Sequence, residues 1–402
     1  MVVKYFGNIY KPTEGGWAGR FLVLIWKGVY NLKTVKIILV TILLLMYTNI
    51  AAIAMEPETS GKAAVLIDGS NGRILFEKNS SVKLPMASTT KIMTAIVALE
   101  NGNLNDMITI PPEASGIEGS SIWLSPGETH SLRDLLYALM LRSGNDAATA
   151  IAIHIGGSVN KFVDMMNKTA KRIGAENTNF INPHGLHDDN HYSTAYDLAL
   201  IASYGLKNPV FEEIVSTKYY TIPWEGHDWD RALRNKNKIL WTYEGANGVK
   251  TGYTKKAGRC FVGSAKRNGM QLIAVVLNCG PMFEESMALM DYGFENYKNV
   301  CIFKHGQLID SLPVRKGILE KVDVVTEQEY TLALNKLEQK QVKTKVMIPN
   351  SLDAPVEKGQ RVGSIKIYLK DELINEIPII AKESVRKKTV WDFFCSMVNI
   401  WR

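Results

Sequence analysis

Ser88 and Lys91 have the types and the spacing that covalent catalysis needs. A helix that begins at Ser88 would place both side chains on one face, because they are three residues apart. A serine hydroxyl attacks a carbonyl only when a neighbouring base takes its proton, and a lysine amine becomes such a base when burial or nearby positive charge lowers its pKa. The helix amino terminus also adds partial positive charge near the backbone N–H of Ser88, which favours an oxyanion there. The pair indicates acyl transfer, but the same pattern alone also fits an ordinary helix start.

Two further motifs decide between these interpretations. Ser143–Asn145 reads Ser-Gly-Asn in a tight link between two predicted helices, and Lys250–Gly252 reads Lys-Thr-Gly in a predicted strand. Ser-x-x-Lys followed by motifs of these two kinds is typical of serine β-lactamases and penicillin-binding proteins. The three motifs occur here in the expected order and settings, which favours the catalytic interpretation.

The hydrophobic pattern predicts the elements that position these motifs. A hairpin is expected at 62–77, around a Gly-Ser-Asn-Gly turn. Helices are expected where apolar residues recur every three or four positions, at 88–99, 131–142, 146–155, 159–173, 196–204 and 284–297. Strands are expected at 249–253, 259–265 and 271–277. Strands, helices and strands again predict an α+β domain in which helices cover a sheet.

Beyond about Val300 the sequence changes to short alternating runs, which predict a small β-rich second domain. Examples lie at 321–325, 344–348 and 364–369. A chain of 402 residues is also too long for a single ordinary core. We expect an extension and signal peptide at 1–54, a catalytic domain at 55–299, the β-rich domain at 300–382 and an amphipathic helix at 383–402.

The amino-terminal region predicts export. Ile37–Met46 is an uncharged run behind two lysines, and Ala52–Ala54 has the small-x-small pattern of a cleavage site. We expect a signal peptide cleaved near Ala54; the alternative is an uncleaved anchor over 35–54. The long segment before the run predicts a translation start near Leu32.

The carboxy-terminal segment Glu383–Arg402 predicts a helix at the membrane surface. Its aromatic and apolar residues recur at helical spacing behind the basic run Arg386–Lys388. They are Trp391, Phe394, Val398 and Trp401. The alternative is a terminal helix that docks on the protein itself. The net charge of +7 suits an anionic wall or lipid surface and does not require nucleic acid as a partner.

From Lys62 to Glu383 the chain resembles the D-alanyl-D-alanine carboxypeptidases among the low-molecular-weight, type-5-like penicillin-binding proteins, serine peptidase family S11. The matching segments are PMASTTKIMTA, LMLRSGNDAA, NPHGL, GVKTGYT and LDAPVEKGQRVG. The resemblance implies a penicillin-binding or serine β-lactamase-like catalytic domain, with an antiparallel sheet covered by helices, followed by a small β-rich domain. It implies removal of the terminal D-alanine from peptidoglycan pentapeptide stems, penicillins and other β-lactams as covalent inhibitors, an extracytoplasmic location and no cofactor.

The resemblance also assigns roles to the motif residues. Ser88 would be the acylated nucleophile, Lys91 its general base and Ser143 the proton relay toward the leaving amine. Asn145 would hold the substrate's amide.

The strand motif would bind the other end of the substrate. Lys250 and Thr251, followed by Gly252, would hold the terminal carboxylate, which needs a cation and a hydroxyl donor. The backbone N–H of Tyr253 would be the second oxyanion donor.

Several features qualify this interpretation. Met282 stands where the family often has an arginine that supports carboxylate binding. His184 could indicate a Ser–His mechanism, but a structural role at the edge of the cleft is simpler. The histidines and aspartates of His187–His191 fit a solvated turn better than a metal site. Cys260 and Cys279 are expected as thiols, although their place in neighbouring runs leaves a disulfide open.

Two other functions compete with the carboxypeptidase. A serine β-lactamase would need a glutamate-activated water, but no Glu-x-x-x-Asn element lies between the second and third motifs. A non-catalytic wall-binding or morphogenetic scaffold would not need the intact motifs. An endopeptidase that cuts peptide cross-links would use the same mechanism, and the sequence leaves it open.

Overall fold

A computed structural model describes residues 56–392 of the chain, except residue 225. The predicted signal peptide, the alternative anchor and the translation start near Leu32 lie outside the described residues. Most of the predicted carboxy-terminal helix also lies outside them. Within the described part of the chain, no helix is both long enough and apolar enough to span a bilayer.

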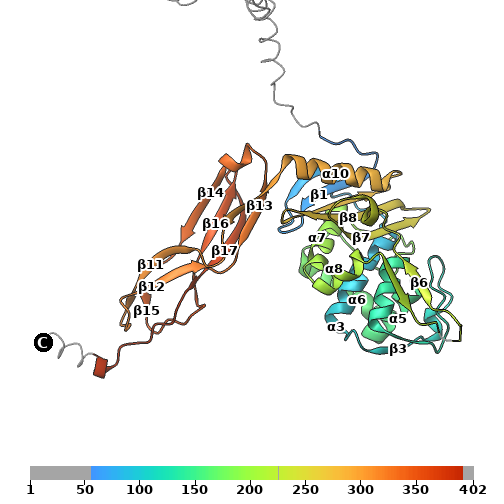
Figure 1. The fold of residues 1–402 in the computed structure, drawn as a ribbon, viewed down its shortest axis with the longest axis horizontal. Coiled ribbons are helices and arrows are strands. Elements are labelled where there is room, and N and C mark those ends of the chain that lie inside the picture. The colour runs from blue at the N-terminus through green and yellow to red at the C-terminus, as the bar shows by residue number, and fades with distance from the viewer. Residues whose placement is uncertain (1–55, 225, 393–402) are drawn as a thin grey trace, which may run out of the picture. The chain divides into compact units, whose positions relative to one another are not determined.

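The first part of the chain is built on a five-stranded antiparallel sheet (Figure 1). Its strand order is β2-β1-β9-β8-β7. The strands are β1 (Ala63–Asp68), β2 (Ile74–Lys78), β7 (Ala246–Thr254), β8 (Gly258–Arg267) and β9 (Met270–Leu277). Strand β1 is buried along its whole length because it lies inside the sheet, between β2 and β9. Strand β7 ends the sheet and so leaves one backbone edge for other partners.

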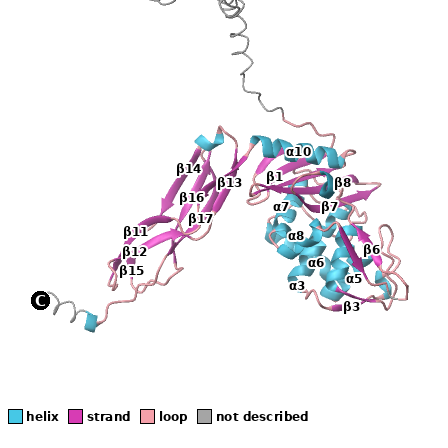
Figure 2. Ribbon diagram, viewed as in Figure 1, coloured by secondary structure: helices cyan, strands magenta, loops and turns pink. Residues whose placement is uncertain are grey.

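Helices cover this sheet and form two hydrophobic cores (Figure 2). One core contains the helices α3 (Lys91–Asn101), α4 (Leu132–Tyr137), α5 (Asn145–Gly156), α6 (Val159–Ile173), α7 (Ala195–Leu206) and α8 (Pro209–Ser216). The other contains α10 (Met282–Asn296), whose residues pack against β8 and β9. Helix α3 is buried over its first two turns and contacts α5, α6 and α7, so the residue at its start is held firmly.

The predicted hairpin, helices and strands of this part are all present, and α6 has the predicted bounds. The sequence did not predict the short elements β3 (Met107–Thr109), β4 (Thr129–Ser131), α8, β5 (Tyr219–Ile222), β6 (Arg231–Arg234) and α9 (Ile239–Thr242). Elements this short have little periodicity of their own and depend on tertiary contacts. The predicted α+β fold class is confirmed.

The second part of the chain is β-rich, as predicted. A six-stranded sheet has the order β14-β16-β17-β12-β11-β15, and β10 pairs with β13. The strands are β10 (Lys298–Phe303), β11 (Leu308–Arg315), β12 (Lys321–Thr326), β13 (Tyr330–Leu334), β14 (Val342–Met347), β15 (Leu352–Asp353), β16 (Arg361–Leu369) and β17 (Glu372–Ala381). Alternate residues of β16 and β17, such as Ile365 and Ile377, fill a separate core.

One expectation from the sequence needs correction here. The helix predicted from Glu383 does not begin there, because Val385 is buried and its backbone N–H donates to the Val356 carbonyl at 2.8 Å. Helical structure begins only at Val390. The expectation of thiols at Cys260 and Cys279 agrees with the structure, in which both are buried and free.

Candidate active site

Ser88 lies in a short 3₁₀ turn, η1 (Ala87–Thr90), that leads directly into α3. Lys91 is the first residue of α3 and is fully buried. Its Nζ atom lies 3.2 Å from Ser88 Oγ, 2.7 Å from Asn145 Oδ1 and 2.5 Å from the carbonyl oxygen of His184. The structure therefore brings the predicted nucleophile and base into direct contact.

These three contacts can be made by Lys91 in its charged form and in its neutral form. A neutral amine has two N–H bonds to donate and one lone pair to accept with. Asn145 Oδ1 and the His184 carbonyl can only accept, so they take the two N–H bonds. In the neutral form the lone pair is left to face Ser88 Oγ, the atom to which a charged Lys91 donates its third N–H. This arrangement is poised for transfer of the serine proton to Lys91.

The electrostatic surroundings favour that neutral form. Burial lowers the pKa of Lys91 well below its ordinary value, and the nearby charges of Lys250 and Lys236 lower it further. Lys236 was not predicted from the sequence. It follows β6, is largely exposed, and donates from Nζ to Ser120 Oγ at 3.0 Å. No local motif marks it, because only the fold brings it near α3.

The second motif is shaped by an irregular helix end. Helix α4 continues into a π-helical turn, Ala138–Arg142, after which Ser143 adopts a left-handed conformation with φ of 67°. The Ser143 hydroxyl is buried and has no hydrogen-bond partner among the described residues. A buried hydroxyl without a hydrogen-bond partner costs free energy, and such groups are often functional. The Ser143 hydroxyl is therefore suited to form a hydrogen bond with a bound substrate.

Asn145 begins α5 and is held by the loop that precedes α4. Its backbone N–H donates to the Ser120 carbonyl at 2.7 Å, and its Nδ2 donates to the Glu118 carbonyl. Because Nδ2 carries two N–H bonds, one of them remains for another acceptor. Asn145 thus joins Lys91 to this loop and can still reach a substrate.

The third motif lies on the edge strand β7. Lys250 is buried and donates from Nζ to the Thr251 carbonyl at 3.0 Å, and burial, with the charge of Lys236, lowers its pKa to about 7. Gly252 passes close to the nucleophile, since a Cβ atom there would lie 3.0 Å from the backbone nitrogen of Ser88. Tyr253 follows and is exposed. The strand edge and the Ser88 N–H therefore lie side by side, as an oxyanion site requires.

The chain's similarity to known proteins agrees with this geometry. Residues 50–280 match the family model of peptidase S11, D-alanyl-D-alanine carboxypeptidase, and residues 297–387 match that of the penicillin-binding protein 5 C-terminal domain. The chain belongs to the D-alanyl-D-alanine carboxypeptidase family. The predicted family and enzyme class are confirmed, and the matches support the carboxypeptidase over the β-lactamase and scaffold alternatives.

Individual relatives are similar over most of their length. The D-alanyl-D-alanine carboxypeptidase DacF of Bacillus subtilis is 35% identical over 349 residues, which are 85% of this chain and 90% of the relative. The crystal structure of penicillin binding protein 5 from Haemophilus influenzae has a TM-score of 0.70 and 30% identity, and covers 83% of this chain and 100% of its own. A structure of PBP3 from Streptococcus pneumoniae has a TM-score of 0.70 at 27% identity, over 82% of this chain and 100% of its own.

Two loop histidines support the site of this family member without acting as bases. Burial, together with the charge of Lys91, lowers the pKa of His184 to about 3, and its carbonyl holds Lys91. His191 is buried, accepts the Ile181 N–H at Nδ1 and contacts Thr90 Oγ1 with Nε2 at 2.7 Å. Since Nδ1 accepts, Nε2 carries the proton and donates to Thr90. The His191 ring therefore supports the turn that carries Ser88, while the His184 ring accepts the Leu186 N–H within its own loop.

Met282, at the position where the family often has an arginine, does not supply a positive charge to the site. It begins α10 and packs against the apolar core on that side of the sheet. A cation approaches the turn just before it: Arg259, which is paired with Tyr253 across β7 and β8, donates from Nη1 to the Gly280 carbonyl at 3.0 Å. The sequence did not mark Arg259.

Proposed function

We propose that Ser88 is the nucleophile with which this enzyme removes the terminal D-alanine from peptidoglycan pentapeptide stems. The observation that carries the proposal is the contact of a fully buried Lys91 Nζ with Ser88 Oγ at 3.2 Å. Lys91 takes the hydroxyl proton while Oγ attacks the carbonyl carbon of the penultimate D-alanine. The backbone N–H groups of Ser88 and Tyr253 stabilise the oxyanion that forms.

Collapse of this tetrahedral intermediate releases D-alanine. The C–N bond breaks and the leaving amine needs a proton, which passes from Lys91 through the Ser143 hydroxyl. The result is an ester between Ser88 and the shortened stem. Water then attacks the ester and gives a proton to Lys91, and Lys91 passes this proton to Ser88 Oγ, which leaves as the free hydroxyl while the shortened stem leaves as its carboxylic acid. β-Lactams acylate the same serine and stop at the ester.

The terminal carboxylate of the substrate binds at β7. Thr251 supplies a hydroxyl, and Lys250 supplies positive charge in its protonated form. Asn145 donates its remaining Nδ2 hydrogen to a backbone carbonyl on the amino-terminal side of the scissile bond. This assignment is supported by the position of Gly252, whose backbone lies close to the Ser88 nitrogen. The neighbouring residues of β7 are therefore near the nucleophile.

The test combines product analysis with active-site labelling. Mass spectrometry of a pentapeptide stem should show loss of a single D-alanine with the wild-type enzyme and no loss with Ser88→Ala. A fluorescent penicillin should label the wild type and not the variant. An intact pentapeptide beside a cleaved cross-linked dimer would assign the enzyme as an endopeptidase, and rapid release of hydrolysed penicillin would assign it as a β-lactamase.

We also propose that the enzyme acts outside the cytoplasmic membrane and is held at its surface. The apolar run Ile37–Met46 with the Ala52–Ala54 pattern supports export, and the aromatic, basic segment after Glu383 supports peripheral attachment. Removal of residues 389–402 should move the processed enzyme from the membrane fraction to the soluble one. An unchanged distribution would contradict the attachment.

A further inference from the structure

Three tryptophans gather on two loops beside the active site, and we call Trp123, Trp224 and Trp229 the tryptophan rim. Trp123 is 74% exposed and Trp229 is 63% exposed, while Trp224 is half-buried. The Trp224 ring stacks on His227 with centroids 4.0 Å apart, and His227 meets Trp229 edge-on at 5.7 Å. Arg231 joins the backbone of Trp123 to the ring of Trp224, and exposed aromatic rings on neighbouring loops are a mark of a binding surface.

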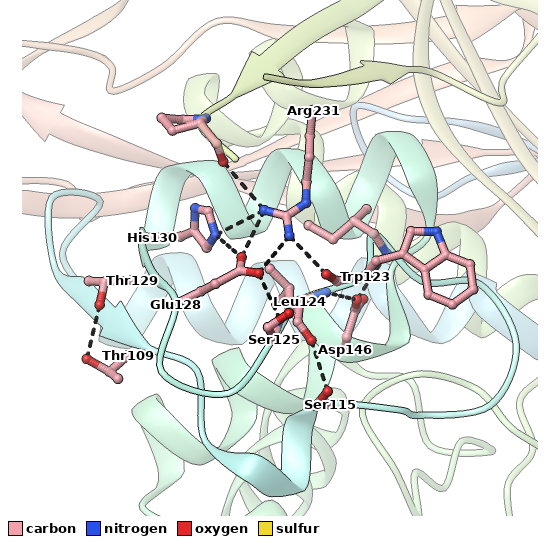
Figure 3. A network of polar contacts seen from close by, with 12 residues as sticks. Thr109, Ser115, Trp123, Leu124, Ser125, Glu128, Thr129, His130, Asp146 and Arg231 are labelled. Atoms are coloured by element: carbon pink, nitrogen blue, oxygen red, sulfur yellow. Dashed lines mark hydrogen bonds and ion pairs between the residues drawn. The ribbon is translucent and has the colours of Figure 1, made fainter. Parts of the chain in front are cut away.

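A buried ion pair holds the two loops together (Figure 3). The guanidinium of Arg231 binds both carboxylate oxygens of Glu128 at 2.9 Å, and Glu128 also contacts His130 at 2.9 Å. The same guanidinium donates to the Trp123 carbonyl at 2.9 Å and lies 4.6 Å from the centre of the Trp224 ring. The backbone at Trp123 and the ring of Trp224 are therefore held in place before any ligand arrives, which lowers the entropy cost of binding.

The rim continues the wall of the active site. The loop that carries Trp123 also binds Asn145, through the Ser120 and Glu118 carbonyls. The side chain of Asp146 accepts from Ser121 Oγ at 2.5 Å and from the Leu124 N–H at 3.2 Å, and so ties this loop to α5. Ser120 and Trp123 are three residues apart, a distance of at most roughly 10 Å.

That spacing suits the other end of the proposed substrate. Four residues of a pentapeptide stem lie between the scissile bond and the sugar that carries the stem, and four extended residues span at most about 14 Å. The carboxylate binds at Thr251 and the amide at Asn145, so the stem leaves the catalytic residues on the Asn145 side. The sugar then comes within reach of Trp123.

We propose that the tryptophan rim binds the amino-sugar glycan to which the stem peptide is attached; this inference rests on the proposed function. The C–H face of a sugar ring packs well on an aromatic face, which is rich in electrons. Asp228 and Asp230 are exposed on either side of Trp229 and supply acceptors for sugar hydroxyls. The same carboxylates are repelled by anionic lipid headgroups, so the chemistry favours a saccharide over a membrane surface.

Two substrates with the same stem test the proposal. One is the free pentapeptide and the other is the disaccharide-linked pentapeptide. We expect the wild type to have a kcat/KM about tenfold higher on the disaccharide-linked stem, a gain that two stacked rings can supply. The double variant Trp123→Ala/Trp229→Ala should lose this preference. The control is Trp391→Ala, another tryptophan that is 70% exposed, and it should keep the preference.

The outcomes separate this inference from the proposed function. Loss of D-alanine from both substrates at equal rates in the wild type would overturn the glycan site and leave the carboxypeptidase intact. No loss from either substrate would reject the proposed function itself. Binding to vesicles of anionic phospholipid that disappears in the double variant would overturn the glycan in favour of a membrane. Quenching of tryptophan fluorescence in Ser88→Ala by the free disaccharide, absent in the double variant, would support the glycan.

Discussion

Two clusters of buried charge lie close to each other in the catalytic domain, and they are built in opposite ways. In the active site Lys91 and Lys250 are both buried, and neither forms an ion pair among the described residues, 56–224 and 226–392. Under the tryptophan rim, Arg231 is paired with Glu128 through two contacts. A buried cation without a partner gives up its proton easily, whereas a paired one keeps it.

The pKa values of these groups shift in agreement with the difference between the unpaired lysines and the paired glutamate. Burial lowers the pKa of Lys91 and of Lys250, in the second case to about 7. Burial alone would raise the pKa of Glu128, but hydrogen bonds from Arg231 and His130 outweigh it and lower that pKa to about 2. The first cluster can exchange protons near neutral pH and the second cannot. One is suited to catalysis and the other to holding two loops in place.

The largest expected effect is a loss of catalysis when Lys91, a buried lysine of the active site, is replaced. Lys91→Met should slow acylation by a fluorescent penicillin by roughly 10³-fold, because a general base contributes about that much. Its melting temperature should fall only modestly, because the loss of the donor to Asn145 Oδ1 and to the His184 carbonyl is partly offset by removal of a buried amine that lacks an ion-pair partner. Lys161→Met, at an exposed lysine on α6, is the control and should acylate normally. Acylation of Lys91→Met within tenfold of the wild type would exclude Lys91 as the base.

Mutation of the buried ion pair between Glu128 and Arg231 should change the stability of the protein. Glu128→Gln leaves the buried Arg231 without its carboxylate and should lower the free energy of unfolding by about 3–5 kcal/mol. Urea denaturation measures this loss. The double variant Glu128→Leu/Arg231→Met removes both charges and should recover much of it. A single variant as stable as the wild type would mean that the pair does not hold the loops.

Removal of the charge at Lys250 should increase the free energy of unfolding, whereas removal of the charge at Glu128 should decrease it. Its pKa is lower in the folded protein than in the unfolded chain, so the folded state binds fewer protons and the penalty is greatest below pH 7. Lys250→Met should therefore raise the free energy of unfolding by about 2 kcal/mol at pH 6, after the loss of one hydrogen bond. The gain should shrink as the pH rises toward about 10.5, the unfolded value. A gain that does not vary with pH would point to packing rather than charge.

The smallest expected effect comes from Lys236, the exposed lysine whose charge acts on Lys91 and Lys250. Lys91 acts only when it is neutral, so the acylation rate falls as the pH drops below its pKa. Lys236→Ala removes a positive neighbour, raises the pKa of Lys91 and should move this acid limb upward by about half a pH unit. Acylation rates measured across pH test this, with Lys161→Ala as the control. A downward shift would contradict the direction.

Strongly periodic segments and local chemistry were predictable from the sequence. Helix α6 has the predicted bounds because its apolar residues face one core and its polar residues face solvent. The three motifs were found because each is short and carries residue types with specific chemistry. The boundary near Glu383 was wrong because the burial of Val385 outweighed the local helical pattern.

The reactive groups and most of the elements that carry them could be identified from the sequence alone. The sequence could not show that Lys91 is buried between Asn145 and His184, residues 54 and 93 positions away, where burial lowers its pKa. It also could not show Lys236 beside the site, or the pairing of Arg231 with Glu128 across 103 positions. Burial and long-range charge set the pKa of each group, and both exist only once the chain has packed.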